Sequence, residues 1–285
     1  MKKTIRIGGV PEHFNITWKV GIEQGLLTKS GFDIQWTDFP GGTGAMTKAL
    51  KDNELDLAII LTEGAVSGIV NGYPFKLISL FVKSPLIWGI HKYAGSDFSL
   101  KEIKGKKYAI SRMGSGSHLM ACVDAHKRGL QINNNQFVIV NNLEGAVSAL
   151  QEGTADLFLW EKFTTKPYVD KGIFSRIGEC VTPWPCFSIA VRTGFYDKNK
   201  HELEEILNII FSINKNIKDS KGIIGLISQK YKLKPEDVEE WIEGVEWAHS
   251  REIEEDVIYQ VQASLLSLNI ITLTLDYEEI VIIDS

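Results

Sequence analysis

The stretch that decides the fold is Tyr108-Ala109-Ile110-Ser111-Arg112-Met113-Gly114-Ser115-Gly116-Ser117-His118. It begins as an apolar strand, continues as a loop of small residues, and ends where a helical pattern starts. Small side chains and free backbone N–H groups at a helix start let an anion or a polar ligand approach closely. The same pattern is typical of an ordinary β–α turn with a serine cap, so this stretch alone leaves both interpretations open.

Strand, loop and helix patterns of this kind alternate along the chain. Apolar or alternating runs predict strands, and capped periodic runs predict helices between them. Before residue 83 the expected strands are 4–10, 32–39, 55–61 and 75–82, and the expected helices are 16–27, 45–51 and 65–70. Beyond residue 105 the expected strands are 106–110, 136–140 and 155–160, and the expected helices are 117–128, 144–151 and 161–171. This order indicates an α/β fold with largely parallel sheets.

A short internal match suggests two similarly built lobes. Ala49-Leu50 precedes Asp56-Leu57 by seven positions, Ala149-Leu150 precedes Asp156-Leu157 by the same seven, and a glutamate follows in each copy, Glu63 and Glu161. Two extended segments with prolines, 83–90 and 181–191, are interpreted as crossings between the lobes. Lobe 1 is therefore expected to comprise 1–86 and 188–285, with lobe 2, 87–187, inserted. Residues 202–268 are expected to be mostly helical, and the tail to end in a β-like run.

Composition and charge narrow the function classes. The chain has 285 residues, 44% hydrophobic and 24% charged, which is ordinary for a soluble globular protein. A net charge of −5 argues against nucleic-acid binding. The three cysteines lack CxxC spacing and are expected to be free thiols in a reducing compartment. No stretch reaches the length of a membrane span, and no apolar signal region follows the basic start. As it stands, the chain is expected to be cytoplasmic; with a removed leader, it would be periplasmic or surface-anchored.

The order of these features resembles the type 2 periplasmic solute-binding proteins, in the branch that binds sulfonates, nitrate or thiamine pyrimidine precursors. The resemblance rests on Gly41-Gly42-Thr43-Gly44, the segment 56–64, the loop 111–118 and Pro183-Trp184-Pro185-Cys186-Phe187. It implies two Rossmann-like α/β lobes joined by two crossing strands, a ligand in a central cleft, hinge closure and an ABC-transporter permease as partner. The cysteine-rich run of the fungal pyrimidine synthases with this fold is absent, so their enzymatic role does not carry over.

The resemblance places the ligand at the carboxyl ends of strands, where helix starts point into the cleft. This placement selects thirteen candidate ligand-binding residues from the loops: His13, Gly42, Thr43, Gly44, Thr62, Glu63, Arg112, Ser115, Gly116, Ser117, His118, Glu161 and Trp184. Each also has a structural interpretation. His13 would otherwise be a surface loop histidine, Thr43 a helix cap, and Trp184 a packing residue at the hinge.

Two ligand chemistries follow from these candidates. If Arg112 and the helix starts dominate, the ligand is anionic or zwitterionic, with Ser115, Gly116 and Ser117 around an oxyanion. If Glu63 and Trp184 dominate, the ligand is an amino-bearing aromatic such as a pyrimidine, with the indole stacked on it.

The sequence favours a binding protein over an enzyme. There is no paired histidine spacing for a metal, no Walker A or GxGxxG loop for a cofactor, and no GxSxG nucleophile. No catalytic residue, metal or cofactor is assigned. We interpret the chain as the substrate-binding component of an ABC-type transporter. The alternatives are a cytoplasmic enzyme of thiamine-precursor or menaquinone-type biosynthesis, with an acid/base pair from Glu63, His13 or His118, and a sensory domain.

Overall fold

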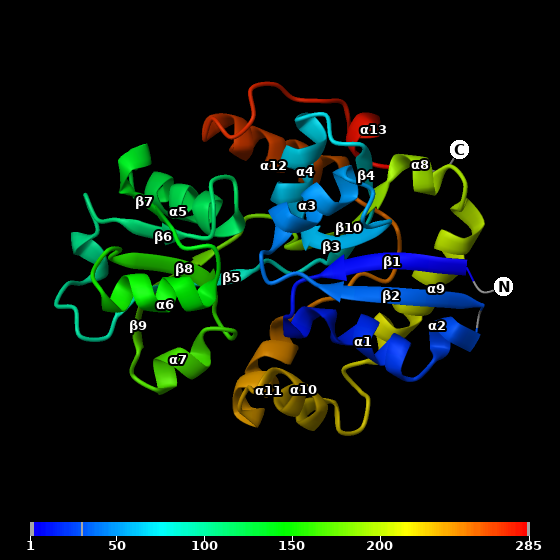
Figure 1. Ribbon diagram of the computed structural model, residues 1–285, viewed down its shortest axis with the longest axis horizontal. Coiled ribbons are helices and arrows are strands. Elements are labelled where there is room, and N and C mark those ends of the chain that lie inside the picture. Colours follow the sequence, from blue (N-terminus) through cyan, green and yellow to red (C-terminus); the bar gives the residue numbers. More distant parts are fainter. Residues whose placement is uncertain (1–2, 30, 284–285) are drawn as a thin grey trace. The chain divides into compact units, whose positions relative to one another are not determined.

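The structure is a computed structural model that describes residues 3–29 and 31–283. The chain divides into two compact units (Figure 1): unit 1 comprises residues 1–84 and 184–285, and unit 2 comprises residues 85–183. The chain therefore leaves unit 1 after Ser84 and returns to it at Trp184. The first stretch of unit 1 ends at 84 instead of the expected 86, and the second begins at 184 instead of 188.

Unit 1 is built on a mixed sheet that has five strands within the described residues, in the order β2-β1-β3-β10-β4. Its strands are β1 (Lys3–Gly9), β2 (Phe32–Asp38), β3 (Leu57–Leu61), β4 (Phe75–Val82) and β10 (Phe187–Arg192). β1 pairs in parallel with β2 and β3, whereas β10 lies antiparallel between β3 and β4. Every residue of β3 is buried, as its unbroken apolar run predicts.

Helices of unit 1 cover this sheet and extend into the C-terminal region. They are η1 (His13–Asn15), α1 (Ile16–Glu23), α2 (Leu26–Lys29), α3 (Thr43–Lys51), α4 (Thr62–Val70), α8 (Thr193–Tyr196), α9 (Lys200–Asn216), α10 (Ile223–Tyr231), α11 (Pro235–Gly244), α12 (Glu255–Ser267) and α13 (Tyr277–Ile280). The helix expected over 16–27 is two helices, because Gly25 between them has a φ of 68°. The prediction that the tail ends in a β-like run is wrong. Asp276 and Glu279 form a capping box that starts α13, and beyond this helix one β-bridge joins Val281 to Leu77.

Unit 2 repeats the plan with a sheet ordered β7-β6-β8-β5-β9 within the described residues. Its strands are β5 (Ile87–Tyr93), β6 (Tyr108–Ile110), β7 (Phe137–Ile139), β8 (Leu157–Glu161) and β9 (Phe174–Val181), and its helices are η2 (Leu100–Glu102), α5 (Gly116–Lys127), η3 (Asn134–Gln136), α6 (Leu143–Gln151) and α7 (Lys166–Asp170). β6 is parallel to β7 and β8, and β5 is antiparallel to β8 and β9. Both sheets are thus mixed rather than largely parallel, because the segments interpreted as crossings supply an antiparallel strand to each.

Two expectations for unit 2 are wrong. No strand is expected over residues 174–181, yet β9 forms there as the partner of β5. A helix is expected over 161–171, whereas Glu161 ends β8 and the helix begins only at Lys166. The Glu161 carboxylate accepts hydrogen bonds from the backbone N–H groups of Phe163 and Thr164, which turns the chain between these two elements.

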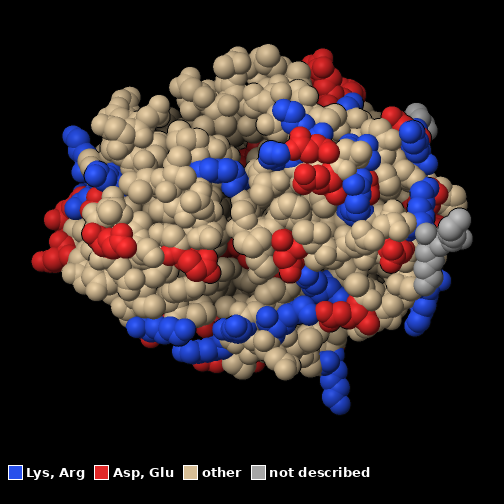
Figure 2. Space-filling model, in the orientation of Figure 1, with Lys and Arg blue, Asp and Glu red and all other residues tan. Residues whose placement is uncertain are grey.

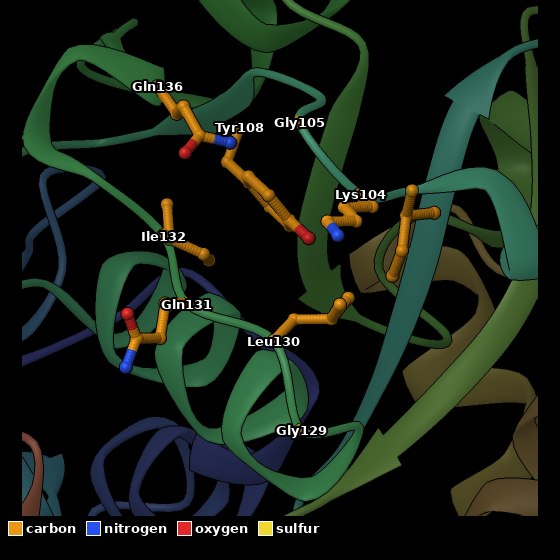
Figure 3. Close-up of a pocket in the computed structure, with 9 residues that line it drawn as sticks. Lys104, Gly105, Tyr108, Gly129, Leu130, Gln131, Ile132 and Gln136 are labelled. Carbon is orange, nitrogen blue, oxygen red and sulfur yellow. The ribbon is translucent and has the colours of Figure 1, made fainter.

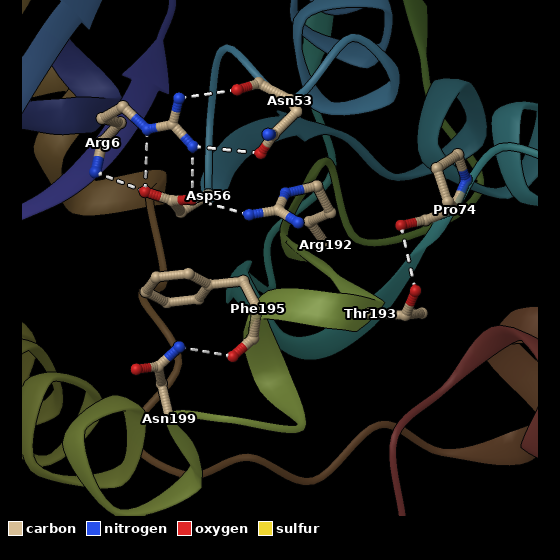
Figure 4. A network of polar contacts seen from close by, with 8 residues as sticks. All are labelled: Arg6, Asn53, Asp56, Pro74, Arg192, Thr193, Phe195 and Asn199. Atoms are coloured by element: carbon tan, nitrogen blue, oxygen red, sulfur yellow. Dashed lines mark hydrogen bonds and ion pairs between the residues drawn. The ribbon is translucent and has the colours of Figure 1, made fainter.

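The internal match has a physical basis in two aspartates, Asp56 and Asp156. Asp56 accepts a hydrogen bond from the Arg6 N–H at 3.0 Å (Figure 4), and its own N–H donates to the Arg6 carbonyl at 2.9 Å. Asp156 makes the same pair of bonds with Lys107, at 2.8 and 2.9 Å. Each aspartate therefore fixes the start of a central strand against its parallel neighbour. The match does not extend to the glutamates, because Glu161 ends β8 whereas Glu63 lies in α4, beyond the end of β3.

Charged side chains of both signs occur on the face shown in Figure 2, with a row of basic side chains along its lower edge. Elsewhere on this face, basic and acidic side chains are interspersed among uncharged residues. Among the described residues, no helix has the length and apolar character needed to cross a membrane.

Candidate functional site

Glu63 is the centre of the candidate site in unit 1. It lies in the first turn of α4, just beyond the carboxyl end of β3, and its side chain is buried. Its Oε2 accepts a hydrogen bond of 2.8 Å from the indole N–H of Trp184. Its Oε1 is buried and has no hydrogen-bond partner among the described residues. Burial raises the pKa of Glu63 to about 7, although hydrogen bonds from its own N–H and from Trp184 oppose the shift.

The hydroxyl groups of two further candidates in unit 1, Thr43 and Thr62, are already engaged in hydrogen bonds. The Thr43 hydroxyl accepts from the Leu61 N–H at 3.1 Å, so the expectation that Thr43 caps its own helix is wrong. Gly42, with a φ of 68°, is the N-cap of α3 instead, and Gly44 lies in the first turn. The Thr62 and Ser188 hydroxyls lie 2.8 Å apart. These contacts hold the starts of α3 and α4 at the carboxyl edge of the sheet.

Gly64 ends the segment 56–64 on which the predicted resemblance rests, but it is not among the thirteen candidate ligand-binding residues. A Cβ added at Gly64 would lie 2.4 Å from Cγ2 of Thr43, so only glycine allows α4 to pack this closely against Thr43. Gly64 was visible in the sequence as the small residue after Glu63. Ser188, the partner of Thr62, carried no local signal because it comes from a strand more than a hundred residues away in the sequence.

His13 is buried in an aromatic cluster of unit 1, which overturns its interpretation as a surface loop histidine. Its side chain is 1% exposed, and its ring lies 4.9 Å from that of Phe14 and 4.3 Å from that of Trp241. Burial lowers the pKa of His13 to about 3, so its imidazole is neutral at physiological pH. Unit 1 therefore gathers Thr43, Thr62, Glu63 and Trp184, with His13 in its core.

In unit 2 the serines of the loop 111–118 bond to the loop itself. Ser115 is the N-cap of α5: its hydroxyl accepts from the His118 N–H and donates to the Arg112 carbonyl at 2.7 Å. The Ser117 hydroxyl accepts from the Ser111 N–H at 3.0 Å and lies 3.1 Å from the Ser115 hydroxyl. The hydroxyls predicted to surround an oxyanion thus hold the turn together. Gly116 begins α5 and adds no side chain.

His118 and Arg112 complete this loop. Nδ1 of His118 accepts from the Gly114 N–H at 3.1 Å, which assigns the ring proton of the neutral imidazole to Nε2. Burial lowers the pKa of His118, so the neutral form predicted from its place in the first helical turn is favoured. Arg112 is half-buried, and burial also lowers its pKa.

Glu161 differs from Glu63 despite equal burial. Its carboxylate accepts from the backbone N–H of Phe163 and from both the N–H and the hydroxyl of Thr164. Burial raises the pKa of Glu161 to about 7, and these hydrogen bonds oppose the shift. Its carboxylate is therefore committed to the turn after β8. In the described part of the chain, no three His, Cys, Asp or Glu side chains gather as metal ligands do.

A serine substitution tests the structural role of the loop. Ser115→Ala is expected to lower the free energy of unfolding by about 1 kcal/mol, because it removes the N-cap of α5. Chemical denaturation measures the change, with Ser148→Ala as the matched control, because Ser148 is exposed within α6. A loss equal to that of the control would contradict the capping role.

A family model and several solved structures match this chain. A family model described as Ca3427-like PBP matches residues 88–180, within unit 2. Over 98% of this chain and 95% of the other, the structure superposes on the Candida albicans CA3427 gene product, described as having the generic periplasmic binding protein fold, with a TM-score of 0.88 at 25% identity. The chain has the periplasmic binding protein fold. The predicted resemblance and fold class are therefore confirmed.

Bacterial proteins with the periplasmic binding protein fold also match along the whole chain. The alkanesulfonate-binding protein SsuA from Xanthomonas axonopodis pv. citri, bound to MOPS, has a TM-score of 0.82 at 16% identity, covering 98% of this chain and 97% of that one. The aliphatic sulphonate-binding SsuA from Escherichia coli has a TM-score of 0.76 at 16% identity, with the same coverage. No curated protein sequence matches the chain. The chain therefore shares its fold with these two sulfonate-binding proteins, and identities this low do not carry a ligand or a role across.

Proposed function

We propose that this chain is a solute-binding protein for a small organic molecule bearing hydrogen-bond donors, such as an amino-substituted pyrimidine. The observation that carries the proposal is Glu63. Its Oε1 is buried without a hydrogen-bond partner among the described residues, and leaving such an atom unpaired costs about 1–3 kcal/mol. A ligand amino group that donates to Oε1 would remove this cost. The neighbouring Trp184 indole, held by Glu63 at 2.8 Å, would offer a planar surface.

The same geometry argues against a sulfonate or nitrate as the ligand. A negative ligand would be repelled by the ionised form of Glu63, and with a pKa of about 7 this form predominates above neutral pH. The hydroxyls of Ser115 and Ser117, which would have to receive an oxyanion, already bond within their loop. The amino-bearing ligand is therefore the better supported of the two chemistries. Transport with an ABC permease and a ligand-linked hinge motion are part of this proposal.

A ligand comparison tests the proposal. 4-Amino-5-aminomethyl-2-methylpyrimidine is expected to raise the melting temperature and bind in calorimetry, whereas ethanesulfonate and nitrate are not. Glu63→Gln is expected to weaken pyrimidine binding about 10- to 100-fold, because a charge-assisted hydrogen bond is lost. Glu54→Gln is the matched control, since Glu54 is exposed in the same unit. Stronger binding of ethanesulfonate, or equal binding by both variants, would overturn the proposed ligand class.

A second candidate function, an enzyme on this fold, rests on the same residue. A carboxyl group with a pKa of about 7 is suited to accept and release protons at physiological pH. Incubating the protein with the same pyrimidine and analysing the mixture by mass spectrometry separates the two. An unchanged ligand supports the binding protein, and a product that disappears in Glu63→Gln supports the enzyme.

A further inference from the structure

Unit 2 contains a cavity of about 290 Å³ that none of the site residues above lines (Figure 3). It lies at the amino end of β6, where Tyr108 begins the strand. The loop 111–118 follows the other end of the same strand. Three residues of β6 separate the two places, a span of roughly 10 Å. The cavity and the loop therefore belong to opposite ends of the sheet of unit 2.

Tyr108 brings a polar group into this cavity. Its side chain is 2% exposed, and in Figure 3 its hydroxyl is directed into the cavity, on the side where Lys104 lies. The hydroxyl has no hydrogen-bond partner among the described residues. Burial and the nearby Asp124 carboxylate raise the pKa of Tyr108 to about 12. The group therefore keeps its proton at physiological pH and can donate a hydrogen bond.

Lys104 makes the cavity positive. Of the described residues that line the cavity, Lys104 alone carries a charge. Its ammonium group has neither an ion pair nor a hydrogen bond within the described part of the chain. The nearby Asp124 carboxylate is paired with Arg128 at 2.8 Å. The cavity thus offers one unpaired cation and one unpaired hydroxyl donor.

Apolar side chains supply much of the remaining wall, and the polar residues Gln131 and Gln136 also line the cavity. α5 ends in a turn in which Gly129 has a φ of 67° and the Leu130 N–H donates to the Ala125 carbonyl at 2.8 Å, which places Leu130 at the cavity. Ile103 and Ile132 line it as well. The Gln136 amide is held in place, because its nitrogen donates to the Lys106 carbonyl at 2.9 Å and its Oε1 accepts from the Asn133 N–H at 3.0 Å.

We propose that this cavity binds a small organic carboxylate with an apolar body. One carboxylate oxygen would accept from the Lys104 ammonium and the other from the Tyr108 hydroxyl, since both donors face the same space. The apolar body would pack against Leu130, Ile103 and Ile132, and the volume suits a single ring or a short branched chain. This site is separate from the solute site of the proposed function and does not depend on it.

Benzoate is the probe that tests the proposal, with benzamide as its uncharged analogue. Added to the full chain at millimolar concentration, benzoate is expected to shift the backbone NMR signals of Gly105, Gly129 and Gln131, whereas benzamide binds at least tenfold more weakly. Tyr108→Phe and Lys104→Met are each expected to weaken benzoate binding about tenfold. Both variants retain the apolar part of the side chain, so we expect the fold to be kept. The melting temperature of each variant checks this.

Lys101→Met is the matched control, because Lys101 is an exposed lysine of the preceding η2 turn that does not line the cavity. Unchanged benzoate affinity in this variant, together with the loss in Tyr108→Phe and Lys104→Met, supports the site. Benzoate that leaves these signals unmoved, or binds Tyr108→Phe as it binds the wild type, overturns the proposal. Equal shifts by benzamide or by inorganic phosphate alone also overturn it, because they remove the need for the charge or for the apolar body.

Discussion

Glu63→Gln is expected to gain stability relative to the wild type, by about 3 kcal/mol, as the pH rises from about 4.5 to 8. The pKa of Glu63 is raised from 4.5 to about 7 by burial, so in this interval the folded state binds a proton that the unfolded state has lost. The wild type therefore loses unfolding free energy as the pH rises to about 7, and no more above it. Glutamine has no such proton and keeps an acceptor for Trp184.

Urea unfolding near pH 5 and pH 8 measures this change as the difference between variant and wild type. The difference is needed because three buried histidines act in the opposite direction. Burial lowers the pKa of His13 to about 3, that of His91 to about 4, and that of His118, so each adds stability as the pH rises towards 6.5. Their contribution is the same in both proteins and cancels. A difference independent of pH would contradict the raised pKa of Glu63.

Glu161→Gln is the matched control for burial. Three donor groups, on Phe163 and Thr164, face the Glu161 carboxylate, whereas the Trp184 indole is the only neighbouring side chain in the described residues that donates to Glu63. A glutamine at 161 offers one acceptor and turns an NH₂ group towards the remaining donors. We expect this variant to be less stable than Glu63→Gln at both pH values, by about 2 kcal/mol. Equal stability would mean that the two acids play the same role.

Asp56→Ala is expected to lower the free energy of unfolding by about 3 kcal/mol, at the lower end of the cost of breaking a buried ion pair. Asp56 is 3% exposed and accepts from Nε of Arg6 at 3.0 Å, from Nη2 of Arg6 at 2.7 Å and from Arg192 at 3.1 Å. Its removal leaves two guanidinium groups and the Arg6 N–H without this partner. Burial raises the pKa of Asp56, but these hydrogen bonds outweigh it, so the pKa lies below 3.8 and the stabilisation persists at neutral pH.

The equivalent Asp156→Ala is the control, with an expected loss of about 1 kcal/mol. Asp156 makes the same backbone bond, to Lys107, but its side chain is 33% exposed and its ion pair with Lys106 is 3.6 Å long. Chemical denaturation gives the two losses, and amide hydrogen exchange at Arg6 and Lys107 locates them in unit 1 and unit 2. A larger loss for Asp156→Ala would contradict the view that the hydrogen bonds to the two arginines account for most of the stabilisation by Asp56.

Local pattern is sufficient to predict much of the fold. The unbroken apolar run of β3 and the small-residue loop before α5 identified a strand and a helix start without knowledge of their partners. β9 was not predicted because its sequence, FSRIGECV, carries charged residues and a glycine. It becomes a strand only by pairing with β5, which is distant in the sequence. The place of β10 between β3 and β4 is likewise set by tertiary contacts that no local pattern contains.

For the candidate site, too, the sequence identifies residues but not all of their contacts. Glu63 and Trp184 were selected from loops far apart in the chain, and the structure joins them by a hydrogen bond. The serines of the loop 111–118 show the opposite case. The sequence places Ser115 at a helix start, but it does not tell whether the Ser115 hydroxyl contacts a ligand or the backbone. The hydrogen bonds to Arg112 and His118 show that it contacts the backbone. The requirement for glycine at position 64 comes from its close contact with Thr43, which is distant in the sequence.

The position of β10 constrains how the chain can be made on a ribosome. The sheet of unit 1 lacks its fourth strand in spatial order until Arg192 has emerged, while β3 and β4 are complete by Val82. Synthesis of the roughly 110 residues between these points takes on the order of 10 s at about 5–20 residues per second. During that time the facing edges of β3 and β4 have no partner, and the continuous unit 2 can fold first. Newly made chains are therefore most exposed to wrong strand pairing, and most in need of chaperones, in that interval.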